Sequence, residues 1–179
     1  MPWHFAVIFL AYVVSVSATE DSQKAPEHVG RELRKAFLTM PSERAGIERS
    51  SEFPRVWGVV MDWPIGQEIA TLVALADGSA SVYTTGTFGI IGGIGHKDVR
   101  TAAKALVKKA DEYYDVSSPN SDLSYPGLDH VRFYFRTFGG TRVVEVPLVT
   151  VMDERGRHSD LFGLAQNVIG QLRMASEQK

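Results

Sequence analysis

The residues best suited to chemistry lie in one glycine-rich loop that leads into a helix. Five glycines fall between positions 86 and 95, and a histidine follows them directly. Glycine has no Cβ, so backbone N–H groups can approach a ligand closely, and the N-terminus of a helix favours an anion. The sequence therefore predicts a site for a small phosphate-type anion. Its expected ligand-binding residues are Gly89, Gly92, Gly93, Gly95, His96 and Arg100.

The same glycines also fit a purely structural role. They would let a strand turn sharply into the helix and let that helix lie close on a sheet, with Ile90, Ile91 and Ile94 filling the core. The loop lacks the Gly-Lys-Ser/Thr ending of a Walker loop and has no parallel βαβ setting. Nucleotide-binding fingerprints therefore do not apply, and both interpretations remain open from the sequence.

A second group of residues could form a surface for a protein partner. Arg132, Tyr134 and Arg136 alternate along one expected strand, and Trp57 and Tyr83 are expected on the same sheet face. Aromatic and arginine side chains are enriched at protein interfaces. The competing interpretation is that the N-terminal helix covers this face and that a glutamate of the neighbouring strand pairs with the arginines.

Residue patterns typical of enzymes and metal sites do not occur. The five histidines are scattered without metal-ligand spacing, there is no cysteine, and no Gly-x-Ser-x-Gly motif is present. We therefore expect no metal, no cofactor and no catalytic residue, and we favour a protein that is not an enzyme. Folding could still bring distant residues together into a catalytic site.

Composition narrows the range of partners. The chain has 179 residues, enough for one domain, which we expect at 26–176. Its formal net charge is −2, so nothing in the overall charge favours nucleic acid or an anionic membrane. A homodimer or a protein partner remains open.

An apolar run at the start of the chain needs its own interpretation. Phe5–Val16 is almost continuously apolar and is followed by small and then polar residues, which is typical of a secretory signal peptide at 1–18. The run is too short for a stable membrane span, and no lysine or arginine precedes it. A buried N-terminal strand or a misassigned start are the alternatives. Localisation follows this choice: periplasmic or secreted with a signal peptide, and otherwise cytoplasmic.

Hydrophobic periodicity predicts the elements that position these residues. A first helix should run from Pro26 to about Leu38, with Arg31, Glu32, Arg34 and Lys35 on the face opposite its apolar residues. Two further helices are expected. They cover Lys97–Tyr114 and about Leu161–Met174.

Five strands are expected, in two groups. In the first group, the strand at 56–62 is expected to end at a Pro64–Gly66 break. The two strands that follow should form a hairpin around Asp77-Gly78, which would place Val73 opposite Val82. The second group is a hairpin around Gly139-Gly140 that would place Glu145 opposite Tyr134. The five expected strands are 56–62, 69–76, 79–85, 131–138 and 141–151.

These elements predict an α+β fold. Hairpin connections imply antiparallel pairing, so we expect a single five-stranded antiparallel sheet with helices packed on it. The element order would be α-β-β-β-α-β-β-α, a profilin- and roadblock-like layout. Such a layout does not assign a function.

Several short segments resemble an uncharacterised family of short bacterial α+β proteins. The segments are Val56–Val59, Leu75–Gly78 and Gly89–His96, followed by Val99-Arg100 and Ala102-Ala103. The resemblance spans about Leu33 to Leu172 and implies that the glycine-rich loop, the histidine and the following helix are shared features. That family has no known activity, so the resemblance implies no site residues.

Two functions follow as hypotheses from the sequence. The first is a small non-catalytic binding or assembly module that pairs through a sheet edge, a helix or an exposed sheet face. The alternative is a protein that binds a small anion on the glycine-rich loop at the N-terminus of the central helix.

Overall fold

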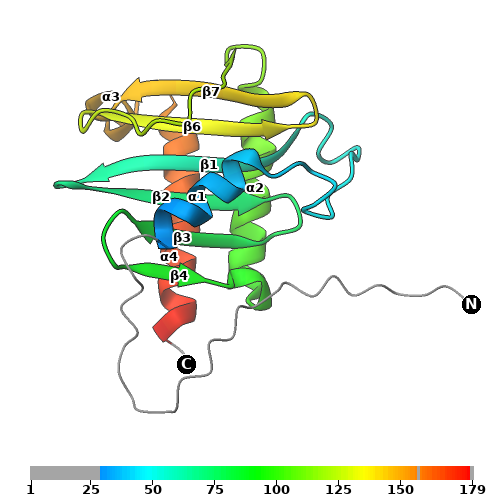
Figure 1. Ribbon diagram of the computed structural model, residues 1–179, viewed down its shortest axis with the longest axis horizontal. Coiled ribbons are helices and arrows are strands. Elements are labelled where there is room, and N and C mark those ends of the chain that lie inside the picture. The colour runs from blue at the N-terminus through cyan, green and yellow to red at the C-terminus, as the bar shows by residue number, and fades with distance from the viewer. Residues whose placement is uncertain (1–28, 157, 178–179) are drawn as a thin grey trace, which may run out of the picture.

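An antiparallel sheet of seven strands forms the middle layer of the protein. In space the strands follow the order β4-β3-β2-β1-β6-β7-β5, which places β1 at the centre (Figure 1). The computed structural model describes residues 29–156 and 158–177. The strands are β1 (Val56–Ile65), β2 (Glu68–Leu75), β3 (Ala80–Thr84), β4 (Gly89–Ile91), β5 (Ser118–Pro119), β6 (His130–Thr137) and β7 (Gly140–Pro147).

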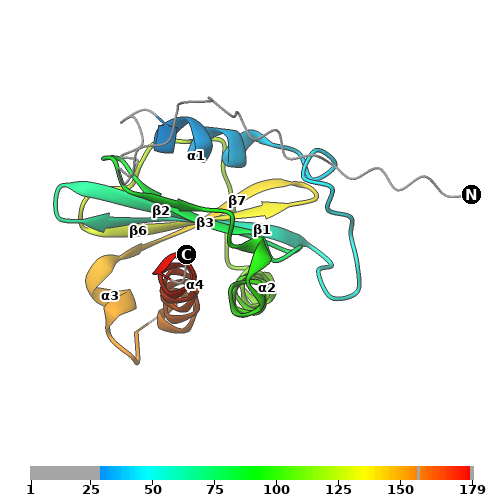
Figure 2. The same ribbon diagram turned by 90° about the horizontal axis from the view of Figure 1, so that it is seen from below.

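Helices cover both faces of this sheet. Helices α2 (Lys97–Glu112) and α4 (Ser159–Glu177) lie side by side on one face, and α1 (Val29–Thr39) lies on the other (Figure 2). A short helix, α3 (Leu148–Met152), follows β7, and a single 3₁₀ turn, η1 (Gly93–Gly95), precedes α2. The sheet is therefore buried on both sides along its central strands.

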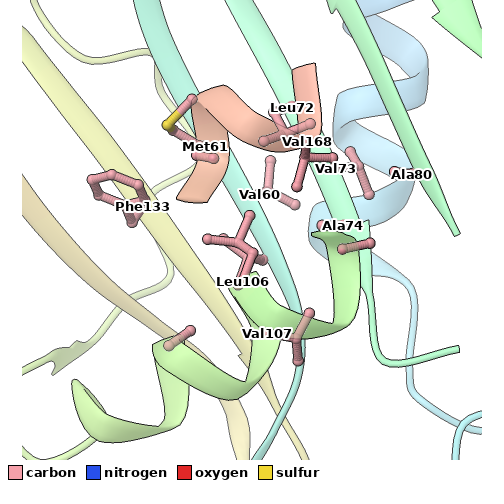
Figure 3. Close-up of a cluster of buried hydrophobic side chains, with 14 of the residues drawn as sticks. Val60, Met61, Leu72, Val73, Ala74, Ala80, Leu106, Val107, Phe133 and Val168 are labelled. Atoms are coloured by element: carbon pink, nitrogen blue, oxygen red, sulfur yellow. The ribbon is translucent and has the colours of Figure 1, made fainter. Parts of the chain in front are cut away.

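The main core lies between the sheet and the α2/α4 layer (Figure 3). Met61, Leu72 and Phe133 of three adjacent strands are fully buried there, together with Leu106 of α2 and Val168 of α4. The apolar stripe of α2 recurs at helical spacing, as the sequence predicts, and every member of it between 99 and 110 is buried. Both later helices are thus confirmed: α2 begins at Lys97 as expected and ends two residues earlier, and α4 is longer by two residues at its start and three at its end.

The α+β character and the antiparallel sheet are confirmed, but the predicted fold class is wrong in detail. The sheet has seven strands and not five. The element order is α1-β1-β2-β3-β4-η1-α2-β5-β6-β7-α3-α4, so the expected order α-β-β-β-α-β-β-α does not hold. The profilin- and roadblock-like layout was predicted from that order, so this prediction is wrong as well.

The two missed strands are very short. β4 is three residues inside the glycine-rich loop, and β5 is two residues inside the connection between α2 and β6. Neither segment is long enough to show a period of two in the sequence. The expected strand at 141–151 also ends at Pro147, and α3 begins at the next residue, Leu148.

The first hairpin has a different register from the predicted one. Leu72 lies opposite Val82, and Val73 lies opposite Ser81. The loop holds three residues, Ala76 to Gly78, rather than the two assumed, with Gly78 at a φ of 93°. A three-residue loop that ends in a left-handed glycine is a common alternative to the two-residue turn. The extra residue exchanges the two faces of β3.

The second hairpin keeps its predicted faces but slides by two residues. Its loop is Phe138-Gly139, so Glu145 lies opposite Arg132 and not opposite Tyr134. Because a shift of two residues preserves the side-chain alternation, Phe133 still shares a face with Val144.

Pro64 does not end β1, as the sequence suggested. It pairs with Ile69 of β2, whose own backbone groups bond toward Thr85 on the β3 side. The nitrogen of Pro64 therefore points away from β2, to the side where pairing with β6 has already stopped at Asp62. No ladder hydrogen bond is lost, so the proline is tolerated.

The expected signal peptide at 1–18 and the start of the first predicted helix lie outside the described residues. From Val29 onward the first helix is present and extends to Thr39. It lies very close to β3, because a Cβ on Gly30 would sit 2.6 Å from the carbonyl oxygen of Thr84. This close approach sets the position of α1 on the sheet.

Candidate functional site: a buried ion pair and an apolar groove at the sheet edge

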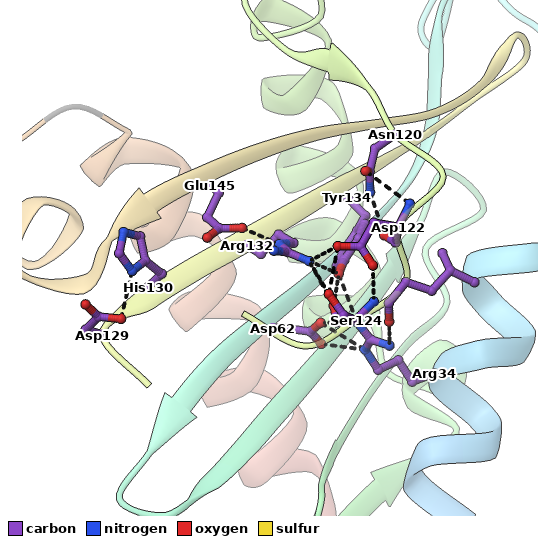
Figure 4. A network of polar contacts seen from close by, with 11 residues as sticks. Arg34, Asp62, Asn120, Asp122, Ser124, Asp129, His130, Arg132, Tyr134 and Glu145 are labelled. Atoms are coloured by element: carbon purple, nitrogen blue, oxygen red, sulfur yellow. Dashed lines mark hydrogen bonds and ion pairs between the residues drawn. The ribbon is translucent and has the colours of Figure 1, made fainter. Parts of the chain in front are cut away.

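A buried ion pair joins α1 to the central strand (Figure 4). The side chain of Asp62, on β1, has no solvent exposure, and Arg34 of α1 is almost fully buried. The Nη2 of Arg34 donates to Oδ2 of Asp62 at 2.6 Å, and its Nε donates to the same carboxylate at 2.9 Å. The hydroxyl of Thr71, on β2, donates to the other carboxylate oxygen at 2.7 Å.

The loop between α2 and β6, together with Tyr134 of β6, supplies the remaining partners of Arg34. Its Nη1 donates to the carbonyl oxygen of Leu123 at 2.7 Å, and its Nη2 donates to that of Ser124 at 3.1 Å. The ring of Tyr125 lies 4.1 Å from the guanidinium carbon, and the Tyr134 hydroxyl accepts a further hydrogen bond. One side chain therefore connects α1, the sheet and this loop.

The surroundings of this pair shift the pKa values of both partners and favour the charged form of the Arg34 guanidinium. Burial disfavours the guanidinium, but the hydrogen bonds and negative charge of Asp62 outweigh it, so the pKa of Arg34 is raised. Burial raises the pKa of the Asp62 carboxyl above its usual value, while Arg34 and the Thr71 hydroxyl act in the opposite direction. Without Arg34, the carboxylate would be an uncompensated charge inside the protein.

The residues expected to form a partner surface lie on the sheet face that α1 covers. Trp57, Tyr83 and Tyr134 are buried, and the Arg136 guanidinium stacks over the Trp57 ring at 5.2 Å. Arg132 is mostly covered and forms an ion pair with Glu145. This arrangement matches the competing interpretation, in which the N-terminal helix covers the face and the glutamate pairs with an arginine. Arg34, expected on the polar face of α1, is the residue that anchors this cover.

The glycine-rich loop is partly a packing device. A Cβ on Gly93 would lie 2.6 Å from side-chain atoms of both Leu172 and Val99, so the loop passes tightly between α4 and α2. Gly92 has a φ of 92°, a conformation that favours glycine. Gly95, by contrast, faces open space.

Internal bonds already use several polar groups of this loop. The Nη1 of Arg100 donates to the carbonyl oxygen of Ile94 at 2.7 Å, and the N–H of His96 donates to the carbonyl oxygen of Gly93 at 3.1 Å. Asp98 adds a negative charge in the first turn of α2. Gly93, His96 and Arg100 are thus tied into the loop by its own hydrogen bonds, whereas Gly89 lies apart from them on β4, against Tyr83.

An apolar groove opens beside the loop, on the α1 side of the sheet. Its volume is about 270 Å³, and none of the side chains that line it is titratable. Phe37 of α1 forms one wall, the strands β2 and β3 form the floor, and the loop forms the other wall. The lining residues are Phe37, Val73, Leu75, Ser79, Ala80, Ser81, Ile91, Gly92, Gly93 and Ile94.

Two isoleucines on the rim are exposed rather than buried. The relative exposure of Ile91 is 62% and that of Ile94 is 47%, whereas Ile90 is partly buried against the core. The structural interpretation of the loop therefore holds for Gly93 but not for these two side chains. For Ile91 the only signal in the sequence would be the period of two along β4, which is too short to detect. Ile94 lies in η1, outside that strand.

β4 is an edge strand whose outer side carries no neighbouring strand in the described sheet. The N–H of Thr84 donates to the carbonyl oxygen of Phe88 at 2.9 Å, which makes these two a hydrogen-bonded pair. Backbone direction alternates along an antiparallel strand, so Ile90 also bonds toward β3. Gly89 and Ile91 consequently direct their N–H and C=O groups outward, next to the groove.

Comparison with known proteins gave no relative: no family model, no curated protein and no solved structure matches the chain. The resemblance to uncharacterised bacterial proteins therefore stays a prediction. Across the described ranges, no cluster of His, Asp and Glu residues is arranged to hold a metal ion. Within the same residues, none of the helices has the length and apolar character that crossing a membrane requires.

We predict that Arg34 and Asp62 are strongly coupled in stability. Arg34→Met should lower the free energy of unfolding by about 3–5 kcal/mol, because it leaves a buried carboxylate unpaired. Adding Asp62→Leu should recover at least about 2 kcal/mol of that loss. Urea denaturation of the two single variants and the double variant measures the coupling. Additive effects of the two substitutions would contradict it.

We also predict opposite behaviour of two neighbouring glycines. Gly93→Ala should lower the free energy of unfolding by about 1–3 kcal/mol, because the new methyl group overlaps Leu172 and Val99. Gly95→Ala is the matched control and should change it by no more than about 0.5 kcal/mol. Thermal and urea unfolding of both variants tests this. Equal losses would mean that Gly93 is not a packing position.

Proposed function

We propose that the protein is a small non-catalytic binding module that takes an extended apolar polypeptide segment along β4. One observation carries the proposal: an apolar groove opens directly beside an edge strand whose backbone groups point outward. A segment added to β4 would form main-chain hydrogen bonds with Gly89 and Ile91. Its alternate side chains would enter the groove.

The lining of the groove supports a binding role over a catalytic one. Its side chains are aliphatic and aromatic apart from two serines, and it offers no acid, base or metal ligand. Apolar side chains are the chemistry it can accept, each contributing about 1.5–3 kcal/mol on full burial. Its 270 Å³ has room for only a few side chains, so we expect micromolar rather than nanomolar affinity.

The exposed edge also supports the proposal. Proteins usually protect edge strands with charges, prolines or covering elements, because unpaired backbone groups recruit other strands. β4 presents Ile91 instead, and exposed Phe88 and Ile94 flank the strand. An edge of this kind is suited to pairing with another segment.

The alternative is a small phosphate-type anion bound by the loop and the N-terminus of α2. Lys97 and His96 support it through their position, but Asp98 and the bond from Arg100 to Ile94 reduce the positive charge available. The 270 Å³ groove beside this loop is apolar, which does not suit an anion. We therefore keep the polypeptide segment as the proposed ligand.

We predict that the protein selects peptides with apolar side chains at alternate positions. A displayed library of random 12-residue peptides, selected on the immobilised full-length chain, should enrich such sequences because β4 pairing has a period of two. The N-terminal apolar run is itself a peptide of this type, so the selection also uses full-length Phe9→Glu. Fluorescence anisotropy with labelled synthetic copies then gives the affinities.

Two surface variants locate the binding site. Ile91→Lys, at the edge, should lower the affinity for the selected peptides at least about tenfold, which corresponds to roughly 1.4 kcal/mol of binding free energy. Val149→Lys, which replaces a similarly exposed residue on α3, should leave the affinity unchanged. Enrichment of no peptide by either chain, or equal losses in the two lysine variants, would contradict the proposed function. Inorganic phosphate that raises the melting temperature would favour the anion alternative.

A further inference from the structure

The start of α1 lies beside the exposed edge strand. Gly30 packs against the carbonyl of Thr84, and the N–H of Thr84 bonds to Phe88, the residue before β4. Val29, the first described residue, therefore lies near the end of β3 that pairs with Gly89 of β4. A segment that reaches α1 along this edge would run opposite to β4, which is the antiparallel direction.

The length of the chain allows this path. Twelve residues separate Val16 from Val29, and twelve extended residues span up to about 40 Å. The three residues of β4 cover only about 10 Å. Phe5–Val16 can therefore reach both the strand and the groove without strain.

The chemistry of this run matches the groove. Phe5–Val16 reads Phe-Ala-Val-Ile-Phe-Leu-Ala-Tyr-Val-Val-Ser-Val, rich in β-branched and aromatic residues that favour strands. It has no charged side chain, and the groove has none either. Pairing on β4 would cover Ile91 and Ile94 and would satisfy the outward backbone groups of Gly89 and Ile91.

We propose that the groove and the edge of β4 are occupied by this chain's own segment Phe5–Val16, added antiparallel to β4. The inference rests on the proposed function and names one ligand for it. The segment would then compete with any external peptide at a high effective concentration. Loss of 1–18 by processing would vacate the groove for a partner.

The absence of cysteine makes a labelling experiment direct. A single cysteine is placed in the full-length chain at Ile94, on the rim of the groove, or at Val149, far along the sequence on α3. Intact mass confirms that residues 1–18 are present, and the rate of maleimide modification is measured for each. Phe9→Glu is then added to release the segment, with Ser22→Glu as a control of equal charge outside the apolar run.

The proposal expects Phe9→Glu to speed modification of Ile94→Cys at least about tenfold, because an open groove exposes the thiol. Ser22→Glu should not change this rate, and neither substitution should change the rate at Val149→Cys. Equal rates at Ile94→Cys with and without Phe9→Glu would overturn the inference. Protection that falls on dilution would also overturn it, since the segment would then come from a second copy.

Failure of this inference and failure of the proposed function give different results. If maleimide modifies Ile94→Cys equally fast with and without Phe9→Glu while Ile91→Lys weakens peptide binding, the proposed binding function holds, and Phe5–Val16 is not the ligand. If the Phe9→Glu chain binds no peptide, the proposed function itself fails.

Discussion

A carboxylate in the middle of a sheet is the constraint on which the rest of the structure depends. Asp62 lies on the central strand with no solvent exposure, where an unpaired charge would cost several kcal/mol. Arg34 compensates it with charged hydrogen bonds from Nε and Nη2, and the Thr71 hydroxyl donates a further one. Because this arginine comes from α1, the charge on the sheet determines which helix must cover this face.

The groove is a consequence of that arrangement. Arg34 and Phe37 are three residues apart and lie on neighbouring turns of α1, so anchoring one positions the other. Phe37 then forms the wall of the groove that faces the glycine-rich loop. The opposite wall is held by Gly93, wedged between Leu172 and Val99. The two walls of the apolar groove are therefore positioned by two separate contacts, the anchoring of α1 by Arg34 and the packing of Gly93.

The long elements could be predicted from the sequence because each repeats its pattern several times. The buried stripe of α2, and the alternation of Phe133 and Phe135, are both present as expected. β4 and β5 could not be found in this way, since three and two residues carry no period. The first hairpin changed faces because Ala76 belongs to its loop, a difference of one residue that composition does not reveal.

The candidate site was less predictable than the fold. The glycine-rich loop can be recognised from the sequence, but the chemistry of its groove also depends on Phe37, which comes from a segment far away in the sequence. Asp62 was visible as a single acid at the end of an apolar run, and Arg34 as one of several charges on a helix. Nothing in their spacing indicates that the two meet, because helix-to-sheet docking is a tertiary property.

Hydrogen exchange in an Asp62→Asn variant tests most directly whether the buried pair holds α1 in place. The account predicts that the amides of α1, Val29 to Thr39, exchange at least about tenfold faster than in the unmodified chain, while those of α2 keep their protection. Unchanged exchange in α1, or equal acceleration in both helices, would show that Arg34 and Asp62 do not specifically secure this helix.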